Sequence, residues 1–338
     1  MGFTSKIGQA LTAREIFELV KDDLKLVERE LEVESAGSVE AVTHIAQYLQ
    51  QSGGKRLRPI LLLLAARTGG AVGEPLSPVA IRMAAIVELI HGATLIHDDV
   101  IDMAQTRRGR PSSNVIWGNH VSVLSGDWLY MQAFQIALRE RNFHVLDMLI
   151  NLTQMMVEGE LLQLERIGKI NVSEADYMQL VDRKTACLFS VCAKLGAHVA
   201  GASEKAETRL GEYAWNIGIA FQLVDDVLDF TARESVLGKP VGSDLREGKV
   251  TLPLIYALET ASTEERRKVE TVLAEKSYDK VSFEEVLGIL KRHRGIDRVR
   301  ERAQDFTDKA RATIAEFPDS PYQRALAAVT DLVTDRDR

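Results

Sequence analysis

Cysteine is scarce in this sequence, and so are the signs of secretion or membrane insertion. The 338 residues include two cysteines, Cys187 and Cys192, whose spacing fits neither a disulfide framework nor a metal site. The N-terminus lacks the apolar core of a signal peptide, and no apolar run approaches the ~18 residues of a membrane span. We therefore expect a protein of the reducing cytoplasm with no transmembrane segment.

Basic residues are too few to suggest a nucleic-acid partner. Lysine and arginine number 42 against 49 aspartates and glutamates, which gives a formal net charge of −7. Bulk electrostatics of this sign argue against nucleic acid, and an acidic ligand would have to be held by local clusters of cations. With 46% hydrophobic residues, the chain has ample material for a core.

Strand-like alternation is also absent, and helical spacing takes its place. Apolar residues recur at helical spacing through most of the chain, the eight prolines fall at expected helix boundaries, and Thr12-Ala-Arg-Glu15 has the form of a capping box. The pattern predicts helices over about 13–34, 38–51, 60–68, 78–102, 115–140, 144–166, 173–200 and 203–232, a polar loop over 233–249, and four or so shorter helices that start near 251, 263, 282 and 320. We predict an all-α fold, one large helical bundle with a single domain over residues 1–338.

Apolar helix formers lead into three aspartates, Asp98, Asp99 and Asp102. Residues four apart lie on one helix face, so Asp98 and Asp102 project together, while Asp99 lies about 100° around the axis. Two stacked carboxylates repel each other by a few tenths of a kcal/mol unless a cation lies between them. Oxygen ligands in an open arrangement suit Mg²⁺, which is usually bound by one or two carboxylates together with substrate phosphates.

A second copy of this pattern favours a metal site over a solvated acidic helix end. Asp225, Asp226 and Asp229 repeat the spacing, and Gln222 shares the face of Asp225. Each copy is embedded in an apolar helix, where lone carboxylates are costly to bury. The two copies predict two metal-binding walls that face each other.

Four groups of basic residues accompany the aspartates. Lys55 and Arg58 lie in Gly-Gly-Lys-Arg-Leu-Arg-Pro, a glycine turn before a helix, where backbone amides and a guanidinium suit a phosphate. The other three are Arg107-Arg108, Lys184-Thr185, and the loop from Lys239 to Lys249. Any one group alone would usually serve solubility, and the glycine turn lacks the spacing of a P-loop. Next to two magnesium-type motifs, the four groups predict a diphosphate ligand.

In this order the motifs resemble those of the trans-isoprenyl diphosphate synthases, also called polyprenyl synthetases. The resemblance covers nearly the whole chain, with ordered motifs from Gly53 to Lys249, and we find no departure from the family pattern in the catalytic set. It implies an isoprenoid-synthase type of bundle around a central cavity, and a homodimer. It allows peripheral contact with a membrane when the product is released. After about residue 253 we find no motif that we can use.

The resemblance also implies roles for individual residues. The metal set would be Asp98, Asp102, Asp225, Asp226 and Asp229, holding Mg²⁺ on an allylic diphosphate. The catalytic set would be Asp98, Asp99, Asp102, Lys184 and Asp225. The allylic substrate would contact Arg107, Lys184, Gln222 and Lys239, and isopentenyl diphosphate would contact Lys55, Arg58, His91 and Arg108. The substrate-binding set would be completed by Thr185 and Lys249.

The chemistry implied by the resemblance is repeated chain elongation. Mg²⁺ and cations stabilise the diphosphate as it leaves, so that the allylic C–O bond ionises. The double bond of isopentenyl diphosphate attacks the carbocation, and a proton is lost to the departing diphosphate. The product is one isoprene unit longer and re-enters as substrate.

Three other readings stay open at this point. A class I terpene cyclase also uses aspartate-rich magnesium motifs, but it takes one diphosphate and has no need for Lys55, Arg58 and His91. A di-iron carboxylate bundle requires two Glu-x-x-His pairs, and we find one suitable pair, Glu88–His91. A non-catalytic subunit would be expected to lose an aspartate motif, and both motifs are intact.

Product length is predicted from the residues just before the first aspartates. Thr94 lies one turn before Asp98 on the same face, with Ala93 beside it, and both are small. A large aromatic residue there would block the channel after about two or three isoprene units, each about one helical turn long. We expect the channel to continue to a floor formed by Tyr130, Met131 and Phe134.

This channel predicts a long-chain product of about seven to ten units (C35–C50), octaprenyl or nonaprenyl (solanesyl) diphosphate. The alternative is a short-chain farnesyl or geranylgeranyl diphosphate synthase. In that case Ala93 would be small only to let two helices approach closely.

Overall fold

The computed structural model describes residues 11–37, 39–51, 53–70, 75–232 and 241–334, and Lys239 lies outside these ranges. The first part of the chain forms α1 (Ala13–Glu34), α2 (Glu40–Gln51), α3 (Leu57–Gly69), α4 (Pro78–Ile101), α5 (Ser113–Trp117), α6 (Asn119–Arg139) and α7 (Phe143–Arg166). The second part forms α8 (Glu174–Val181), the π-helical turn η1 (Asp182–Ala186), α9 (Cys187–Val199), α10 (Glu204–Thr231), α12 (Ser243–Arg246), α13 (Leu252–Leu258), α14 (Thr263–Glu275), α15 (Phe283–Arg292), α16 (Gly295–Ile314) and α17 (Pro321–Thr334). The described residues also include two short antiparallel strands, β1 (Thr106–Arg107) and β2 (Arg110–Pro111). The prediction of an all-α fold is confirmed.

Several helices begin at the capping residues expected from the sequence. The Thr12 hydroxyl accepts a hydrogen bond from the amide of Glu15, and the Glu15 side chain returns to Thr12. Ser77 caps α4 just before Pro78, and Ser203 caps α10. Each such cap satisfies an otherwise unpaired amide and is worth about 1 kcal/mol.

Several helix boundaries differ from the expectation, and α12 lies within the segment 233–249 that was predicted to be a loop. Gly118 has a φ of 79°, a left-handed conformation that ends α5, so the helix predicted over 115–140 is two helices. The helix predicted over 173–200 contains the π turn η1 between α8 and α9. A start at Gly295 was not expected, because no side-chain cap marks it and Arg294 adopts a left-handed conformation instead.

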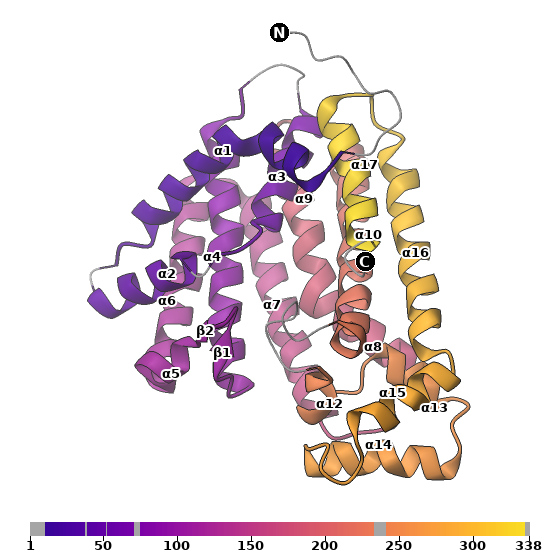
Figure 1. Cartoon of the computed structure of the whole chain (residues 1–338). Coiled ribbons are helices and arrows are strands. Elements are labelled where there is room, and N and C mark those ends of the chain that lie inside the picture. The colour runs from indigo at the N-terminus through magenta and orange to yellow at the C-terminus, as the bar shows by residue number, and fades with distance from the viewer. Residues whose placement is uncertain (1–10, 38, 52, 71–74, 233–240, 335–338) are drawn as a thin grey trace.

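The centre of the bundle is α4, which is buried on most of its sides. It packs against α1, α3, α6 and α9, and α10 packs in turn against α9 and α16. In Figure 1, α14 lies across the end of the bundle at which the β1–β2 hairpin is found. Buried apolar side chains from Ile16 to Val333 form one contiguous core, and the single domain over residues 1–338 stays a prediction.

Among the described residues, α4 is long and apolar enough to cross a membrane. Its most apolar window of 18 residues has a mean hydropathy of 1.7, which corrects the expectation that no run approaches this length. The protein itself buries 61% of that window. Core helices of water-soluble proteins pass the same test, so the length of α4 is weak evidence for a membrane span.

Candidate active site

The first aspartate motif lies at the C-terminal end of α4. Asp98 is half-buried in the last turn, and Asp102 is the residue that ends the helix. Burial raises the pKa of the Asp98 carboxyl to about 6, and the charges of Glu160 and Asp102 add to this effect while Lys184 opposes it. Asp98 therefore faces an interior space that other charged side chains also line.

Asp99 does not share that space. Its side chain is buried, and one of its oxygens accepts a hydrogen bond of 2.6 Å from Nε of Arg107. The catalytic role expected for Asp99 stays a prediction, and what the structure shows is its contact with Arg107. The contact anchors Arg107, which lies on the strand that follows the helix.

Arg107 and Arg108 are carried by the β1–β2 hairpin. Thr106 pairs with Pro111 and Arg107 with Arg110, so the turn consists of Arg108 and Gly109. These two residues have φ angles of 53° and 75°, as a two-residue turn between twisted strands requires. A left-handed arginine costs about 1–2 kcal/mol, which marks Arg108 as a position held in place by its surroundings.

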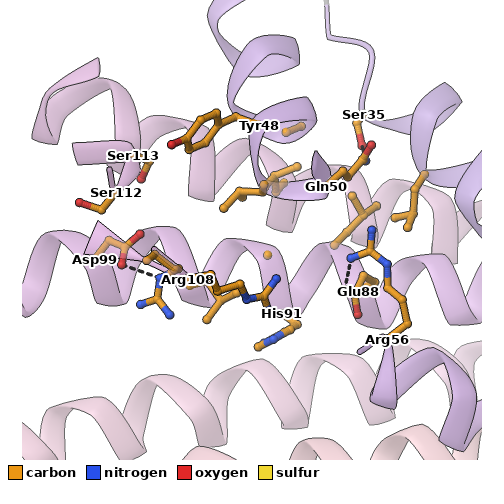
Figure 2. A pocket seen from close by; sticks show the side chains of 18 of the residues that line it. Ser35, Tyr48, Gln50, Arg56, Glu88, His91, Asp99, Arg108, Ser112 and Ser113 are labelled. Carbon is orange, nitrogen blue, oxygen red and sulfur yellow. Dashed lines mark hydrogen bonds and ion pairs between the residues drawn. The ribbon is translucent and has the colours of Figure 1, made fainter. Parts of the chain in front are cut away.

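The hairpin is tied to α2 by Tyr48. The Tyr48 hydroxyl donates a hydrogen bond of 2.8 Å to the carbonyl of Pro111, and the Arg110 guanidinium lies over its ring at 5.1 Å. A cavity of about 50 Å³ separates α2 from α4 here, and Figure 2 shows Tyr48, His91, Asp99 and Arg108 along its wall. The sequence did not predict this role of Tyr48, because no local pattern connects it with Pro111, which lies 63 residues further along the chain.

Lys55, Arg58 and Arg108 are basic residues in and near the glycine turn at 53–54. Arg108 reaches toward the glycine turn, since a Cβ on Gly54 would lie 3.0 Å from its Nη1. Arg58 donates a hydrogen bond of 2.9 Å to Nε2 of His91, which must accept it because a guanidinium is only a donor. Within the described part of the chain, no ion pair reaches Lys55, Arg58 or Arg108.

His91 is a neutral imidazole at this site. Burial lowers its pKa well below the usual range, and the positive charges of Arg58 and Arg108 add to this. Arg56 behaves differently from its neighbours, because its guanidinium contacts Glu28 at 2.6 Å and Glu88 at 2.7 Å. The structure thus divides the glycine turn into one structural arginine and two cations that have no carboxylate partner among the described residues.

The second aspartate motif lies near the C-terminal end of α10, where two of its three members are covered. Asp226 accepts hydrogen bonds from the Tyr177 hydroxyl at 2.6 Å and from Nε2 of Gln222 at 2.8 Å. Asp229 accepts from the Ser243 hydroxyl at 3.0 Å. Asp225 is the one member that is half-buried rather than buried.

Burial also shifts the pKa of Asp226. It raises the pKa of this carboxyl to about 8, and the charges of Asp244 and Asp225 add to the effect, while the hydrogen bonds from Tyr177 and Gln222 oppose it. Both oxygens of this carboxyl already accept a hydrogen bond within the chain. Asp226 and Asp229 were predicted to bind metal, but in this structure their oxygens accept hydrogen bonds from Tyr177, Gln222 and Ser243.

Lys184 and Thr185 lie on the π turn η1, as π turns often do at functional sites. The ammonium of Lys184 contacts Glu160 at 2.5 Å and Gln163 at 3.1 Å, and the Thr185 hydroxyl donates to Gln222 at 2.9 Å. Glu160 and Gln163 were missed by the sequence reading. A signal existed for Gln163, which is a polar residue on the buried stripe of α7.

Two glycines let neighbouring helices approach this turn closely. A Cβ on Gly159 of α7 would lie 3.0 Å from Cβ of Arg183, and a Cβ on Gly218 of α10 would lie 2.7 Å from Cα of Ala186. The second contact is with backbone, which cannot move aside cheaply. The position of η1 is therefore fixed from both sides.

Lys249 reaches the first motif from the segment that follows α12. Its ammonium contacts Asp102 at 3.1 Å and Glu247 at 2.7 Å, and their charges raise its pKa above the usual range although burial opposes this. A cavity of about 210 Å³ adjoins it. The cavity is lined by predicted residues of several elements, namely Lys184, Thr185, Gln222, Asp226 and Lys249.

The predicted channel residues differ in how deeply they are buried. Ala93 is completely buried, and the Thr94 hydroxyl donates to the carbonyl of His91. Tyr130 and Phe134 are half-buried and pack against the core. Met131 is 62% exposed on α6, whereas a channel floor within the chain would cover it, and its place at the floor stays a prediction.

Comparison with known proteins decides the family. A family model described as polyprenyl synthetase matches residues 39–290. The chain belongs to this family. It is 38% identical over 323 residues to the octaprenyl diphosphate synthase of Haemophilus influenzae, covering 96% of this chain and 97% of that protein. It is 37% identical over 298 residues to the geranylgeranyl diphosphate synthase of Methanosarcina mazei, covering 86% and 89%.

A solved structure agrees with this assignment. The polyprenyl synthase of Caulobacter crescentus, in complex with calcium and isoprenyl diphosphate, superposes with a TM-score of 0.91 at 34% identity, covering 98% of this chain and 99% of that one. The chain is therefore a polyprenyl diphosphate synthase, a prenyltransferase whose substrates are isopentenyl diphosphate and an allylic diphosphate. Enzymes of this family generally depend on a divalent metal ion.

Proposed function

We propose that this prenyltransferase adds isopentenyl diphosphate repeatedly to an allylic diphosphate and makes a long-chain all-trans product, octaprenyl or nonaprenyl diphosphate. The observation that carries the proposal is the pairing of two kinds of site. Half-buried carboxylates at the ends of α4 and α10 supply a metal-binding face, and Lys55, Arg58 and Arg108 supply cations without carboxylate partners in the described chain. A cyclase that takes one diphosphate would need only the first.

Mg²⁺ is the proposed metal ion. The donor set consists of the carboxylate oxygens of Asp98, Asp102 and Asp225, and hard oxygen donors in an open arrangement fit Mg²⁺. The two cysteines are buried, and burial raises their thiol pKa values to about 12, so a soft metal finds no ligands there. We assign the metal to these three aspartates and give Asp226 and Asp229 the task of holding α10 and α12 in place.

The cations divide between two diphosphates. Lys184 and Lys249 adjoin the aspartates, where each now pairs with a carboxylate, so they are placed to turn toward an allylic diphosphate held there. Arg107, Thr185 and Gln222 belong to the same group. Arg58, Arg108, Lys55 and neutral His91 form the second group, which we assign to isopentenyl diphosphate.

The proposed reaction follows from this charge arrangement. When bound, Mg²⁺ neutralises the diphosphate and makes it a better leaving group. Lys184 and Lys249 hold the same diphosphate as its charge grows, which favours breaking of the allylic C–O bond. Arg58 and Arg108 hold isopentenyl diphosphate so that its double bond faces the cation formed, and the proton lost after attack goes to the released diphosphate.

The length of the product rests on the wall formed by α4. Ala93 and Thr94 leave no bulky group one turn before Asp98, and Tyr130 and Phe134 on α6 are the proposed floor. Relatives of similar identity include an octaprenyl and a geranylgeranyl diphosphate synthase, so length is the part of the proposal that most needs a direct test. Products formed from labelled isopentenyl diphosphate should separate chromatographically at about C40–C45.

The substitution Ala93→Tyr tests the channel. It should shorten the product to about the farnesyl–geranylgeranyl range while condensation persists, because the new ring closes the channel after about two to four isoprene units. The matched control is Val33→Tyr on α1, where the side chain is 69% exposed, and it should leave product length unchanged. A wild-type product from Ala93→Tyr would show that the tail does not pass this wall.

We also propose a homodimer built on α6 and α7. Exposed apolar residues recur every seven positions on both helices: Leu124, Met131 and Leu138 on α6, and Phe143, Ile150, Val157 and Leu164 on α7. Two such stripes side by side form a surface that a second copy would cover. Sedimentation of wild type against Leu124→Asp/Met131→Asp tests this, with a monomeric wild type as the contrary result.

The enzyme is proposed to act in the cytoplasm and to touch a membrane as it releases its product. The support is the product itself, since a polyprenyl tail of about forty carbons has a large apolar surface that water does not accommodate. Product release should therefore accelerate when phospholipid vesicles are added to the assay. Unchanged steady-state turnover with vesicles would remove this part of the proposal.

A further inference from the structure

Three side chains that take no part in the site described above converge at the opposite end of the bundle. His144 lies in the first turn of α7, His198 in the last turn of α9, and Glu207 in the first turn of α10. Their nitrogen and oxygen atoms lie within 4.8 Å of one another. We propose that this cluster, the His144–His198–Glu207 site, binds one divalent transition-metal ion of the zinc class.

The carboxylate of Glu207 lies between the two imidazoles. Its Oε1 is 2.9 Å from Nε2 of His144, and its Oε2 is 3.1 Å from Nδ1 of His198, while the two ring centroids are 4.5 Å apart. Around a tetrahedral zinc ion with bonds of about 2.0–2.2 Å, neighbouring ligand atoms are about 3.3–3.5 Å apart. The cluster therefore needs only small movements of its side chains to accept an ion.

The donor set and its exposure also suit such an ion. Two histidines and one glutamate leave a fourth tetrahedral position for water. The Glu207 side chain is 12% exposed, and those of His198 and His144 are 27% and 51% exposed, so the carboxylate forms the base of a site that opens to solvent. Imidazole prefers zinc-class ions to Mg²⁺, so the ion used at the aspartates does not compete here.

Asn142 determines the state of His198 in the absence of an ion. Its Oδ1 caps α7 by accepting from the amides of His144 and Val145, so its Nδ2 must donate to Nε2 of His198, at 3.0 Å. His198 then carries its proton on Nδ1, toward Glu207. A metal ion on Nδ1 shifts that proton to Nε2, which turns Asn142 from a fitting partner into an opposing donor.

A substitution that removes the opposing donor at Asn142 should strengthen zinc binding. Asp caps a helix as well as Asn does, and an aspartate at position 142 would accept the proton on Nε2 of His198. A carboxylate behind a histidine ligand fixes its orientation and strengthens metal binding, typically by ten- to a hundredfold. Asn142→Asp should therefore tighten zinc binding about tenfold.

The site is remote from the prenyl-transfer chemistry. Along α7, His144 lies about 24 Å from Glu160, and along α10, Glu207 lies about 27 Å from Asp225. A bound ion would join the starts of two helices whose far ends line the cavity, together with the end of α9. Because the site does not depend on the proposed function, each can fail without the other.

Titration of chelator-treated full-length protein with Zn²⁺, in excess Mg²⁺, tests the proposal by calorimetry. One ion should bind per chain, and Co²⁺ in its place should give the visible absorption of a tetrahedral complex. His198→Ala should weaken binding at least a hundredfold, and Glu207→Gln about tenfold if His198→Ala does not fold. The matched control is His44→Ala, since His44 is an exposed histidine beside Glu40 elsewhere on the surface.

Each of the contrary results would overturn the proposal. Zinc binding that is unchanged in both His198→Ala and Glu207→Gln would place the ion elsewhere. Affinity that falls or stays the same in Asn142→Asp would show that His198 is not a ligand through Nδ1. Prenyl transfer with Mg²⁺ should be the same in all four variants, which separates this test from that of the catalytic site.

Discussion

The two aspartate motifs share one spacing and one position, near the C-terminal end of a long helix, yet their surroundings differ. At the end of α4 the compensating groups are charged: Arg107 pairs with Asp99, and Lys249 with Asp102. At the end of α10 the middle aspartate, Asp226, is compensated by neutral groups, because Tyr177 and Gln222 donate hydrogen bonds to it. Helix C-termini repel carboxylates, so both motifs need compensation, and each obtains it by a different route.

The spacing of the aspartates along the helix does not determine which of their side chains are exposed. Spacing decides which aspartates share a helix face, and it is the same in both motifs. Neighbours from distant parts of the chain decide how far each aspartate is covered. α4 therefore contributes two half-buried carboxylates, and α10 contributes one.

Removing the half-buried aspartates should have the largest effect. Asp98→Ala and Asp225→Ala should each lower turnover by about 10²–10³-fold, because each deletes a group that holds the metal on the leaving diphosphate. Steady-state kinetics at saturating substrates and Mg²⁺ measure this, with unchanged circular dichroism as the control. Full activity in both variants, or activity in wild type without any divalent ion, would contradict the metal assignment.

The next largest effects should come from the two groups of cations, which should each affect the KM of a different substrate. Arg58→Ala should raise the KM for isopentenyl diphosphate, and Lys184→Ala that for the allylic partner, each by roughly ten- to a hundredfold, since a charge-assisted hydrogen bond is worth about 1.5–3 kcal/mol. Initial rates with each substrate varied in turn give both constants. Equal effects of both variants on one substrate would mean that the two diphosphates are not divided as proposed.

The middle aspartates offer a matched comparison. Asp99→Asn leaves Arg107 without its charge partner and should cost about 1–3 kcal/mol of stability. Asp226→Asn keeps the shape of a carboxyl whose pKa burial raises to about 8, so its cost should be well below that. Urea unfolding of the two variants measures both values. Equal costs would remove the difference that we draw between the motifs.

The raised pKa of Asp226 predicts a dependence on pH. In the metal-free chain its pKa is about 8 when folded and near the usual value when unfolded, so its contribution is fully present below pH 4 and is lost as pH rises through 8. Relative to wild type, Asp226→Asn should therefore gain stability as pH rises, by up to about 1.4 kcal/mol per unit. Parallel unfolding curves at pH 5, 6 and 7 would speak against it.

A small effect should also come from Tyr177→Phe. It deletes one hydrogen bond to Asp226 and leaves the ring in place, which should cost about 1 kcal/mol of stability. Turnover should change only a few-fold, because Tyr177 acts on α10 through Asp226. A loss as large as that of Asp225→Ala would instead place Tyr177 among the groups that touch substrate.

Local patterns were sufficient for most of the fold and for the motifs. The spacing of apolar residues and the capping residues predicted the long helices, and the repeated aspartates with the ordered basic groups indicated the family. The sequence could not reveal what depends on distant contacts: that Tyr177 and Ser243 cover α10, that Glu160 meets Lys184, or that Met131 faces outward. Gly118 and η1 were missed because a turn conformation or an extra residue in a helix leaves the apolar spacing around it almost unchanged.

The glycines at 159 and 218 have a consequence for the diversification of this enzyme. Because a methyl group at either position would strike η1, changes there displace Lys184 and Thr185 together with the backbone that carries them. A library screened for altered product length should therefore recover almost no substitutions at these two positions. Tolerated variation should accumulate on the α4 and α6 walls, so that tail length can evolve while the chemistry at the head group is conserved.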